Sequence, residues 1–334
     1  MTNSRERLRA AGVLYPHSGV PARFPYGHHL LPWSLMKRPP AGYSFTAAAR
    51  VALWRDLCAE INSGSEPLVV LSSEEFDRLD ALEIASLAQN LSGHDIVPVI
   101  FLRDHADLIE SMFRTYVIHL EYAGPVARFA AEEAPRLDCA GMIGDWIAIA
   151  RRGAAVIMSY EDAAIRQNSI AAFFDAAGLD LELCREDKTL CANASMPAFV
   201  CEVVRDLRAR RVDEPRIQVW VAEVLAAGLP PQLNTEFVSM PREVATGLHR
   251  RFAAEAAAIA ANPALSASLR GSLVASARGA EPEVVRDATH ARALLRRWLS
   301  DMGARISEPV PVPRDGASPA TRTDEADVLP HLEG

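Results

Sequence analysis

The stretch from Ile96 to Val117, IVPVIFLRDHADLIESMFRTYV, decides the fold of this 334-residue chain. Its first part, Ile96 to Leu102, is a short and nearly unbroken apolar run, which is typical of a strand buried on both faces of a parallel sheet. Asp104 follows at a position where it can cap a helix. Apolar residues then recur at the spacing of one buried helical stripe: Leu108, Ile109, Met112, Phe113, Tyr116, Val117 and Leu120.

The polar residues of this stretch indicate an anion site. Arg103 stands at the carboxyl end of the predicted strand, and Ser111 stands two turns into the helix, off the apolar stripe together with Asp107. Ligands of open α/β sheets bind beyond the carboxyl ends of the strands, and a helix N-terminus there favours an anion. Each residue also has a structural alternative. Arg103 could pair with Asp104 or Asp107. Ser111 could point to water or bond to a backbone carbonyl.

The rest of the chain continues this alternation of strands and helices. Further buried strands are predicted at 13–15, 67–71 and 154–158, with helices between them, so the fold class is α/β with a parallel sheet flanked by helices. From about Pro197 onward the pattern is helical, with predicted helices at 200–211, 216–227, 244–261, 264–276 and 291–302. We expect one domain over residues 1–306 and a disordered tail, rich in Pro, Ser, Thr and Asp, over 307–334.

Composition narrows the classes of partner. The net charge is −8 and the isoelectric point is about 5.6, and no basic run announces a nucleic-acid partner. The five cysteines form no CxxC pair, which argues against a disulfide framework or a zinc site and favours a reducing, cytoplasmic location. No apolar signal region opens the chain, and no apolar stretch is long enough to span a membrane.

Several short motifs carry a resemblance to a known family. They are, in order, GVLYP at 12–16, HHLL at 28–31, VVLSSEEF at 69–76, the Arg103 and Ser111 pair, MSYED at 158–162, and NAS at 193–195. This order resembles that of bacterial sulfotransferase-like proteins, over about residues 1 to 200. The resemblance implies a P-loop-like fold that uses 3′-phosphoadenosine 5′-phosphosulfate as co-substrate. It also implies that Arg103 and Ser111 hold the 3′-phosphate and that Tyr160 lies near the adenine.

The resemblance also suggests a catalytic base. Glu74 follows a predicted strand within the first turn of a helix, where it could take a proton from an acceptor hydroxyl on a carbohydrate or small metabolite. Its neighbour Glu75 has capping-box spacing with Ser72, which suits a structural role. Glu74 could also be a solvated carboxylate stabilised by the helix dipole, and His28 is the alternative base. No metal is predicted, because the nearby histidines lack acidic or cysteine ligands at a useful spacing.

One family feature is absent from the sequence. Members of the family resembled begin with a strand and a Gly/Lys/Thr-rich loop that holds the 5′-phosphosulfate, and no such loop is found in this chain. We therefore expect an apolar groove between the strands that end at Leu71 and Leu102, where a partner could add a strand. Two functions remain open: a sulfotransferase that transfers a sulfuryl group to a hydroxyl, and a truncated, inactive relic that acts as a binding protein.

Overall fold

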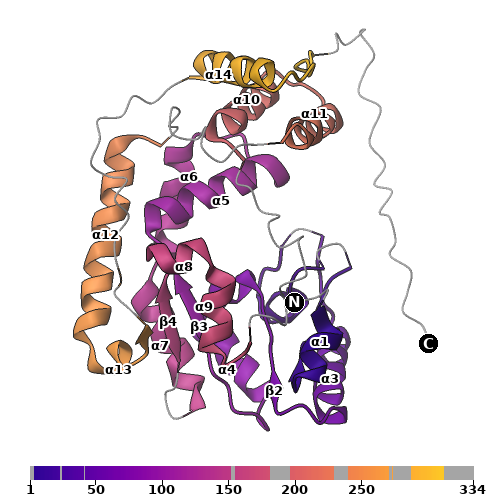
Figure 1. Ribbon diagram of the computed structural model, residues 1–334, viewed down its shortest axis with the longest axis vertical. Helices are drawn as coiled ribbons and strands as arrows, with labels where there is room; N and C mark the ends of the chain where they lie inside the picture. The colour runs from indigo at the N-terminus through magenta and orange to yellow at the C-terminus, as the bar shows by residue number, and fades with distance from the viewer. Residues whose placement is uncertain are drawn as a thin grey trace.

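The computed structural model shows an α/β fold in which small parallel sheets are flanked by helices (Figure 1). This confirms the predicted class at that level. The structure describes residues 4–22, 25–40, 42–151, 155–180, 196–228, 240–270, 273 and 287–311. The NAS motif and almost all of the predicted tail lie outside the described residues.

The described strands form two parallel sheets where one was predicted. Strand β1 (Val13–Leu14) pairs with β2 (Leu68–Val69). In the second sheet β4 (Val156–Ser159) lies between β3 (Val99–Leu102) and β5 (Leu269–Arg270). Within the described chain, β2 and β3 are hydrogen-bonded to different partners and not to each other. The expected groove between them, and a partner within it, stay predictions.

The segment that decides the fold behaves largely as predicted. Helix α5 (His105–His119) follows β3 at once, and the Asp104 side chain accepts a hydrogen bond from the Ala106 N–H as its N-cap. The core of the apolar stripe is buried, but Leu120 is 60% exposed because the helix ends just before it. Asp107 was expected off the buried face and is instead 3% exposed, because it joins the polar site described below.

Five helical segments lie in the part of the chain that carries β1 and β2. Gly12 takes a φ of +79° just after α1 (Arg5–Ala10), as the predicted helix stop requires. The predicted single helix after β2 is in fact two pieces, with Ser73 and not Ser72 as the first cap, and the capping box formed by Asp80 and Glu83. The other segments are α2 (Leu30–Leu35), α3 (Ala47–Ser63), the 3₁₀ helix η2 (Glu74–Arg78) and α4 (Ala81–Asn90).

The middle of the chain connects the strands of the second sheet. Apolar residues of β3, β4 and two helices, α7 and α12, share one core that includes Leu102, Ile143, Ile157 and Phe252. The elements of this region are α6 (Val126–Glu133), η3 (Ala134–Arg136), α7 (Cys139–Ile149), α8 (Ala163–Gln167) and α9 (Ser169–Ala176).

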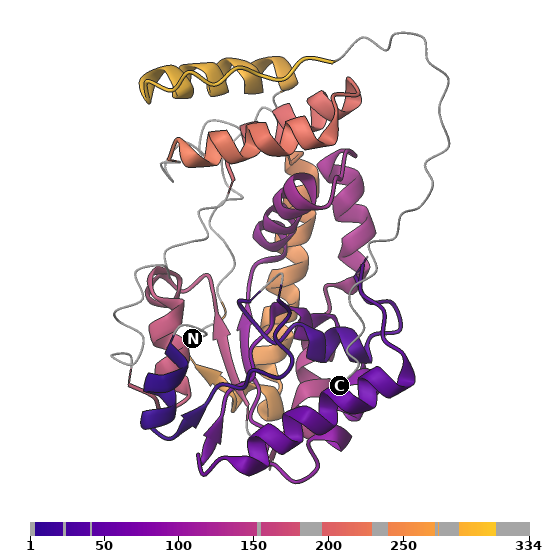
Figure 2. The same cartoon turned by 90° about the vertical axis from the view of Figure 1, so that its right-hand side faces the viewer.

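The helical C-terminal part is confirmed. Its helices divide into two groups that lie in different places in the fold. Helices α10 (Ala198–Ala209), α11 (Glu214–Ala226) and α14 (Ala288–Asp301) stack with α5 and α6 at one end of the molecule, away from the sheets (Figures 1 and 2). Helix α12 (Arg242–Ala261) runs from that end down past β3 and β4 to the short α13 (Pro263–Ser266). The helix predicted for 264–276 was wrong, because Leu269–Arg270 pairs with β4 as a strand.

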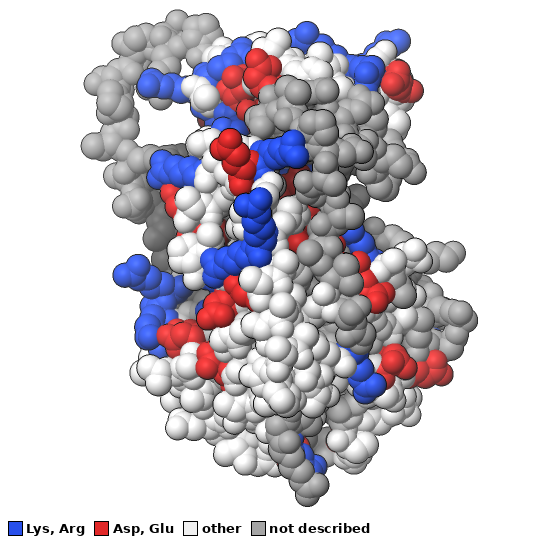
Figure 3. Space-filling view, turned by 90° about the vertical axis from the view of Figure 1, so that its left-hand side faces the viewer, with Lys and Arg blue, Asp and Glu red and all other residues white. Residues whose placement is uncertain are grey.

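The face over α12 carries both signs of charge. Lys or Arg and Asp or Glu side chains alternate over its upper part, whereas the lower part is nearly uncharged (Figure 3). The sequence explains the difference, since FAAEAAAIAA at 252–261 holds a single charged residue, Glu255. Among the described helices, none is both long and apolar enough to cross a membrane.

Candidate functional site

The carboxyl ends of β3 and β4 bring two of the predicted site residues together. Leu102 and Ser159 are register partners, so the next residues along, Arg103 and Tyr160, leave the sheet side by side. The Tyr160 N–H donates to the Leu102 carbonyl at 2.7 Å, which fixes this crossing point. The Arg103 guanidinium carbon lies 5.4 Å from the centre of the Tyr160 ring, within the range of a cation–π contact.

The guanidinium of Arg103 retains unused hydrogen-bonding capacity. Its Nε is buried, and among the described residues it has no hydrogen-bond partner. Burial lowers the pKa of Arg103, and the negative charge of the nearby Asp107 offsets part of that decrease. A buried donor without an acceptor is costly to a fold, so this atom is the place in the site where an anionic ligand would gain most.

Asp107 and Glu161 lie near this arginine and Asp104 follows it in the chain, and each of the three carboxyl groups has another partner. Asp104 is fully buried and its Oδ1 accepts from the Ala106 N–H at 2.9 Å and from His249 Nδ1 at 2.7 Å. Arg166, on α8, lies 3.9 Å from Asp107 and 3.5 Å from Glu161. These carboxylates therefore pair with His249 and Arg166.

Glu161 ties the two strand ends together. One of its carboxylate oxygens accepts from the Asp104 backbone N–H at 3.3 Å, and its own N–H donates to Ser159 Oγ at 3.3 Å. Burial raises the pKa of Glu161, and the neighbouring Asp107 adds to the effect. The Glu161 carboxylate is thus held against the backbone of the two strand ends, near Arg103.

His249 is a member of this site that the sequence did not indicate. It lies on α12, 145 residues from Asp104 in the chain, and its side chain is 13% exposed. The hydrogen bond to Asp104 raises its pKa, because the carboxylate stabilises the imidazolium form. A single His within an amphipathic helix belongs to no motif, so the sequence did not predict that His249 lies at this site.

Ser111 lies farther along the same helix face. It stands four residues after Asp107 in α5, so the two share a face and are about 6 Å apart along the helix axis. Ser111 is half-buried, and its backbone carbonyl accepts from Thr115 Oγ1 at 3.2 Å. In the described residues no hydrogen bond links Ser111 to Arg103, so their joint role in phosphate binding stays a prediction.

The predicted base Glu74 belongs to the other sheet. It opens η2 just beyond β2, and its side chain is 82% exposed. One of its oxygens lies 3.9 Å from His29 Nδ1, and that nitrogen is also hydrogen-bonded to Ser73 Oγ at 2.8 Å. Glu74 is thus free to meet solvent or an acceptor, while the buried His29 is held against Ser73.

The alternative base, His28, is enclosed by the protein. It is 0% exposed, its Nδ1 accepts from the Ser72 N–H at 3.1 Å, and its Nε2 lies 3.1 Å from the Pro16 carbonyl. This pattern assigns the proton of the neutral ring to Nε2. Burial lowers the pKa of His28 to about 4. A ring with both nitrogens engaged serves to join the carboxyl ends of β1 and β2, and this geometry favours Glu74 as the candidate base.

No family model, curated protein or solved structure matches this chain.

Proposed function

We propose that the carboxyl ends of β3 and β4 bind the 3′-phosphate of an adenine nucleotide, and that the protein uses 3′-phosphoadenosine 5′-phosphosulfate to transfer a sulfuryl group to a hydroxyl of a carbohydrate or small metabolite. One observation carries the proposal: Arg103 stands beyond a strand end beside Tyr160, with a buried Nε that has no partner among the described residues. The motif order described above supplies the nucleotide's identity.

Charge and chemistry at the site support this assignment. A phosphate is acceptor-only, so it can take the unused Nε–H of Arg103, and the arginine fork suits its geometry. The carboxylates nearby are engaged by His249 and Arg166, which limits their competition for Arg103. The Tyr160 ring lies within cation–π distance of the guanidinium and offers an aromatic face beside it.

Titration calorimetry with adenosine 3′,5′-bisphosphate tests the proposal. Wild-type protein should bind this ligand, and Arg103→Ala should bind it roughly ten- to hundredfold more weakly under the same conditions. Absence of binding to the folded wild type at millimolar ligand would favour the other function, a non-catalytic relic that acts as a binding protein. The separation of β2 from β3, with Glu74 beyond one and Arg103 beyond the other, is the observation that favours this second function.

Glu74 should be needed for turnover and not for donor binding. Its carboxylate is exposed and lies beyond β2, in the other sheet from Arg103. Glu74→Gln should therefore lower the rate of sulfuryl transfer at unchanged bisphosphate affinity. The measurement is a transfer assay with labelled donor, set beside calorimetry of the same variant. Glu75→Gln is the matched control on the adjacent residue. Full activity in Glu74→Gln would remove this residue from the mechanism.

A further inference from the structure

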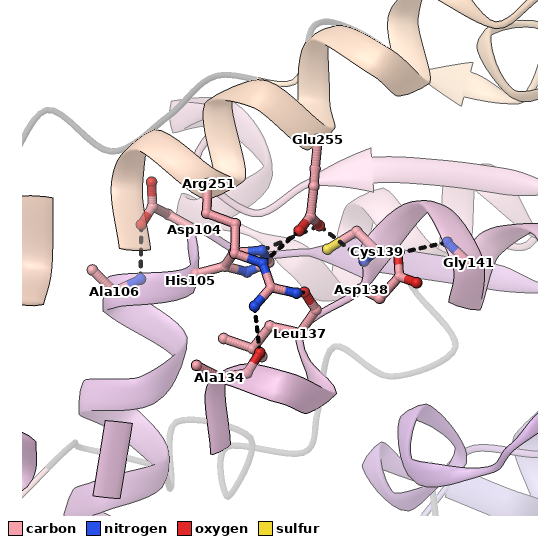
Figure 4. Close-up of polar contacts among 10 residues, drawn as sticks. All are labelled: Asp104, His105, Ala106, Ala134, Leu137, Asp138, Cys139, Gly141, Arg251 and Glu255. Carbon is pink, nitrogen blue, oxygen red and sulfur yellow. Dashed lines mark hydrogen bonds and ion pairs between the residues drawn. The ribbon is translucent and has the colours of Figure 1, made fainter. Parts of the chain in front are cut away.

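A second polar cluster lies one residue beyond Asp104. His105 begins α5, Cys139 begins α7, and Glu255 projects from α12 between them (Figure 4). One ligand atom from each, an imidazole nitrogen, the thiol sulfur and a carboxylate oxygen, lies within 4.8 Å of the other two. This is the one such group of metal-binding side chains among the residues that the structure describes.

The spacing of these atoms suits a transition-metal ion. His105 Nε2 and Glu255 Oε2 are 3.2 Å apart. Two nitrogen or oxygen ligands on one tetrahedral zinc ion are about 3.3 Å apart, and a thiolate sulfur on that ion is about 3.5 Å from either. Because all three atoms already lie within 4.8 Å, a displacement of Cys139 Sγ by about 1 Å completes three corners of a tetrahedron.

The protein already orients one of the three ligands, Glu255. Glu255 Oε1 accepts from Arg251 Nε at 2.8 Å, which turns Oε2 toward His105 and the Cys139 N–H. Arg251 is itself fixed by the Ala134 and Leu137 carbonyls (Figure 4). Hydrogen bonds that hold a carboxylate ligand from behind are typical of metal centres.

His105 is buried with only one of its ring nitrogens in a hydrogen bond to the described residues. The ring is 0% exposed, and its Nδ1 has no hydrogen-bond partner among the described residues. In one neutral tautomer this nitrogen is an unused lone pair. In the other, the Nε2 lone pair faces the Glu255 carboxylate, which is unfavourable unless a cation lies between them. The tautomer protonated at Nε2 donates that proton to Glu255 Oε2, and a cation in place of the proton would hold the two atoms at nearly the same separation.

We propose that His105, Cys139 and Glu255 form a binding site for a divalent transition metal, with zinc as the best match. The mixed nitrogen, sulfur and oxygen ligands select zinc over magnesium or calcium, which take oxygen ligands. Three protein ligands leave a fourth position for water or another ligand. The site joins α5, α7 and α12, and it does not depend on the nucleotide site proposed above.

Cobalt(II) is the direct probe, because it reports a thiolate ligand by an absorption band in the near ultraviolet. Metal-free, reduced protein titrated with Co²⁺ should develop this charge-transfer band together with visible bands of tetrahedral cobalt, and added Zn²⁺ should displace it. Cys139→Ser should lose the charge-transfer band. Cys58→Ser, which changes a half-buried cysteine bonded to the Asn90 carbonyl, is the matched control and should keep it.

A second measurement uses the wild-type chain and so does not depend on how a variant folds. Zn²⁺ should protect Cys139 from alkylation, read by peptide mass spectrometry, and should leave the alkylation of Cys58 unchanged. The proposal is overturned if the wild type shows no cobalt–thiolate band, if folded Cys139→Ser retains the band, or if Zn²⁺ leaves the alkylation rate of Cys139 unaltered.

Discussion

Acidification from neutral pH to about pH 4 should destabilise the folded protein by about 3 kcal/mol through His28 alone. Burial lowers the pKa of this imidazole from 6.5 to about 4, and each pKa unit corresponds to about 1.4 kcal/mol. Between these two pKa values the unfolded chain binds a proton that the native state does not bind, so the free energy of unfolding falls as the pH falls. Above about pH 6.5, and below about pH 4, His28 contributes no pH dependence.

Urea unfolding of wild type and His28→Gln at pH 7 and at pH 4 measures this contribution. Other groups titrate in the same range, so the quantity of interest is the difference in unfolding free energy between the two proteins. This difference should shrink by about 3 kcal/mol on going to the lower pH. His17→Gln, which removes an exposed imidazole near the same strand end, is the control and should follow the wild-type profile. A difference that does not change with pH would mean that His28 has the same pKa in the native and the unfolded state.

Replacing Arg103 should weaken the binding of adenosine 3′,5′-bisphosphate roughly ten- to hundredfold. Loss of a hydrogen bond to a charged group costs about 1.5–3 kcal/mol, which is the basis of that range. Arg103→Lys should also lose affinity, because an ammonium keeps the charge but not the planar fork, and it cannot stack in the same way on Tyr160. Calorimetry at constant ionic strength gives the dissociation constant of each variant.

The matched control removes an arginine elsewhere. Arg128 is 71% exposed on α6 and pairs with Glu132, so Arg128→Ala makes the same change in net charge without touching the site. It should bind the ligand as the wild type does. Unchanged affinity in both Arg103→Ala and Ser111→Ala would reject the phosphate assignment.

The sequence predicted the parts of the site that depend on local order. An apolar run that ends at Leu102 had to place Arg103 at a strand end, and the next helix required a cap, which Asp104 supplies. Tyr160 follows the neighbouring parallel strand, so its proximity to Arg103 follows from strand register. These features involve few residues and strong backbone constraints.

The parts that the sequence did not predict arise from packing between distant segments. His249 and Glu255 reach the start of α5 because α12 lies along the second sheet, across separations of 145 and 150 residues. No spacing rule connects residues so far apart, and the same holds for Cys139. Asp107 was misjudged because a helical stripe marks apolar burial, whereas this carboxylate is buried in a polar site.

Strand pairing was the other source of error. The apolar runs at 13–15 and 67–71 predicted strands correctly, but a run says nothing about which strand lies beside it. Two residues of 269–270 pair with β4 inside a segment whose composition favours a helix, because tertiary contact overrides weak local propensity. The division into two small sheets therefore could not be read from the chain.

The most direct test of the nucleotide site compares two ligands that differ by one group. Wild-type protein is titrated with adenosine 3′,5′-bisphosphate and, separately, with adenosine 5′-monophosphate, which lacks the 3′-phosphate. If Arg103 receives that phosphate, the bisphosphate should bind roughly tenfold or more tightly than the monophosphate, and Arg103→Ala should remove the difference. Equal affinity of the wild type for the two ligands, or binding of neither, would contradict the account.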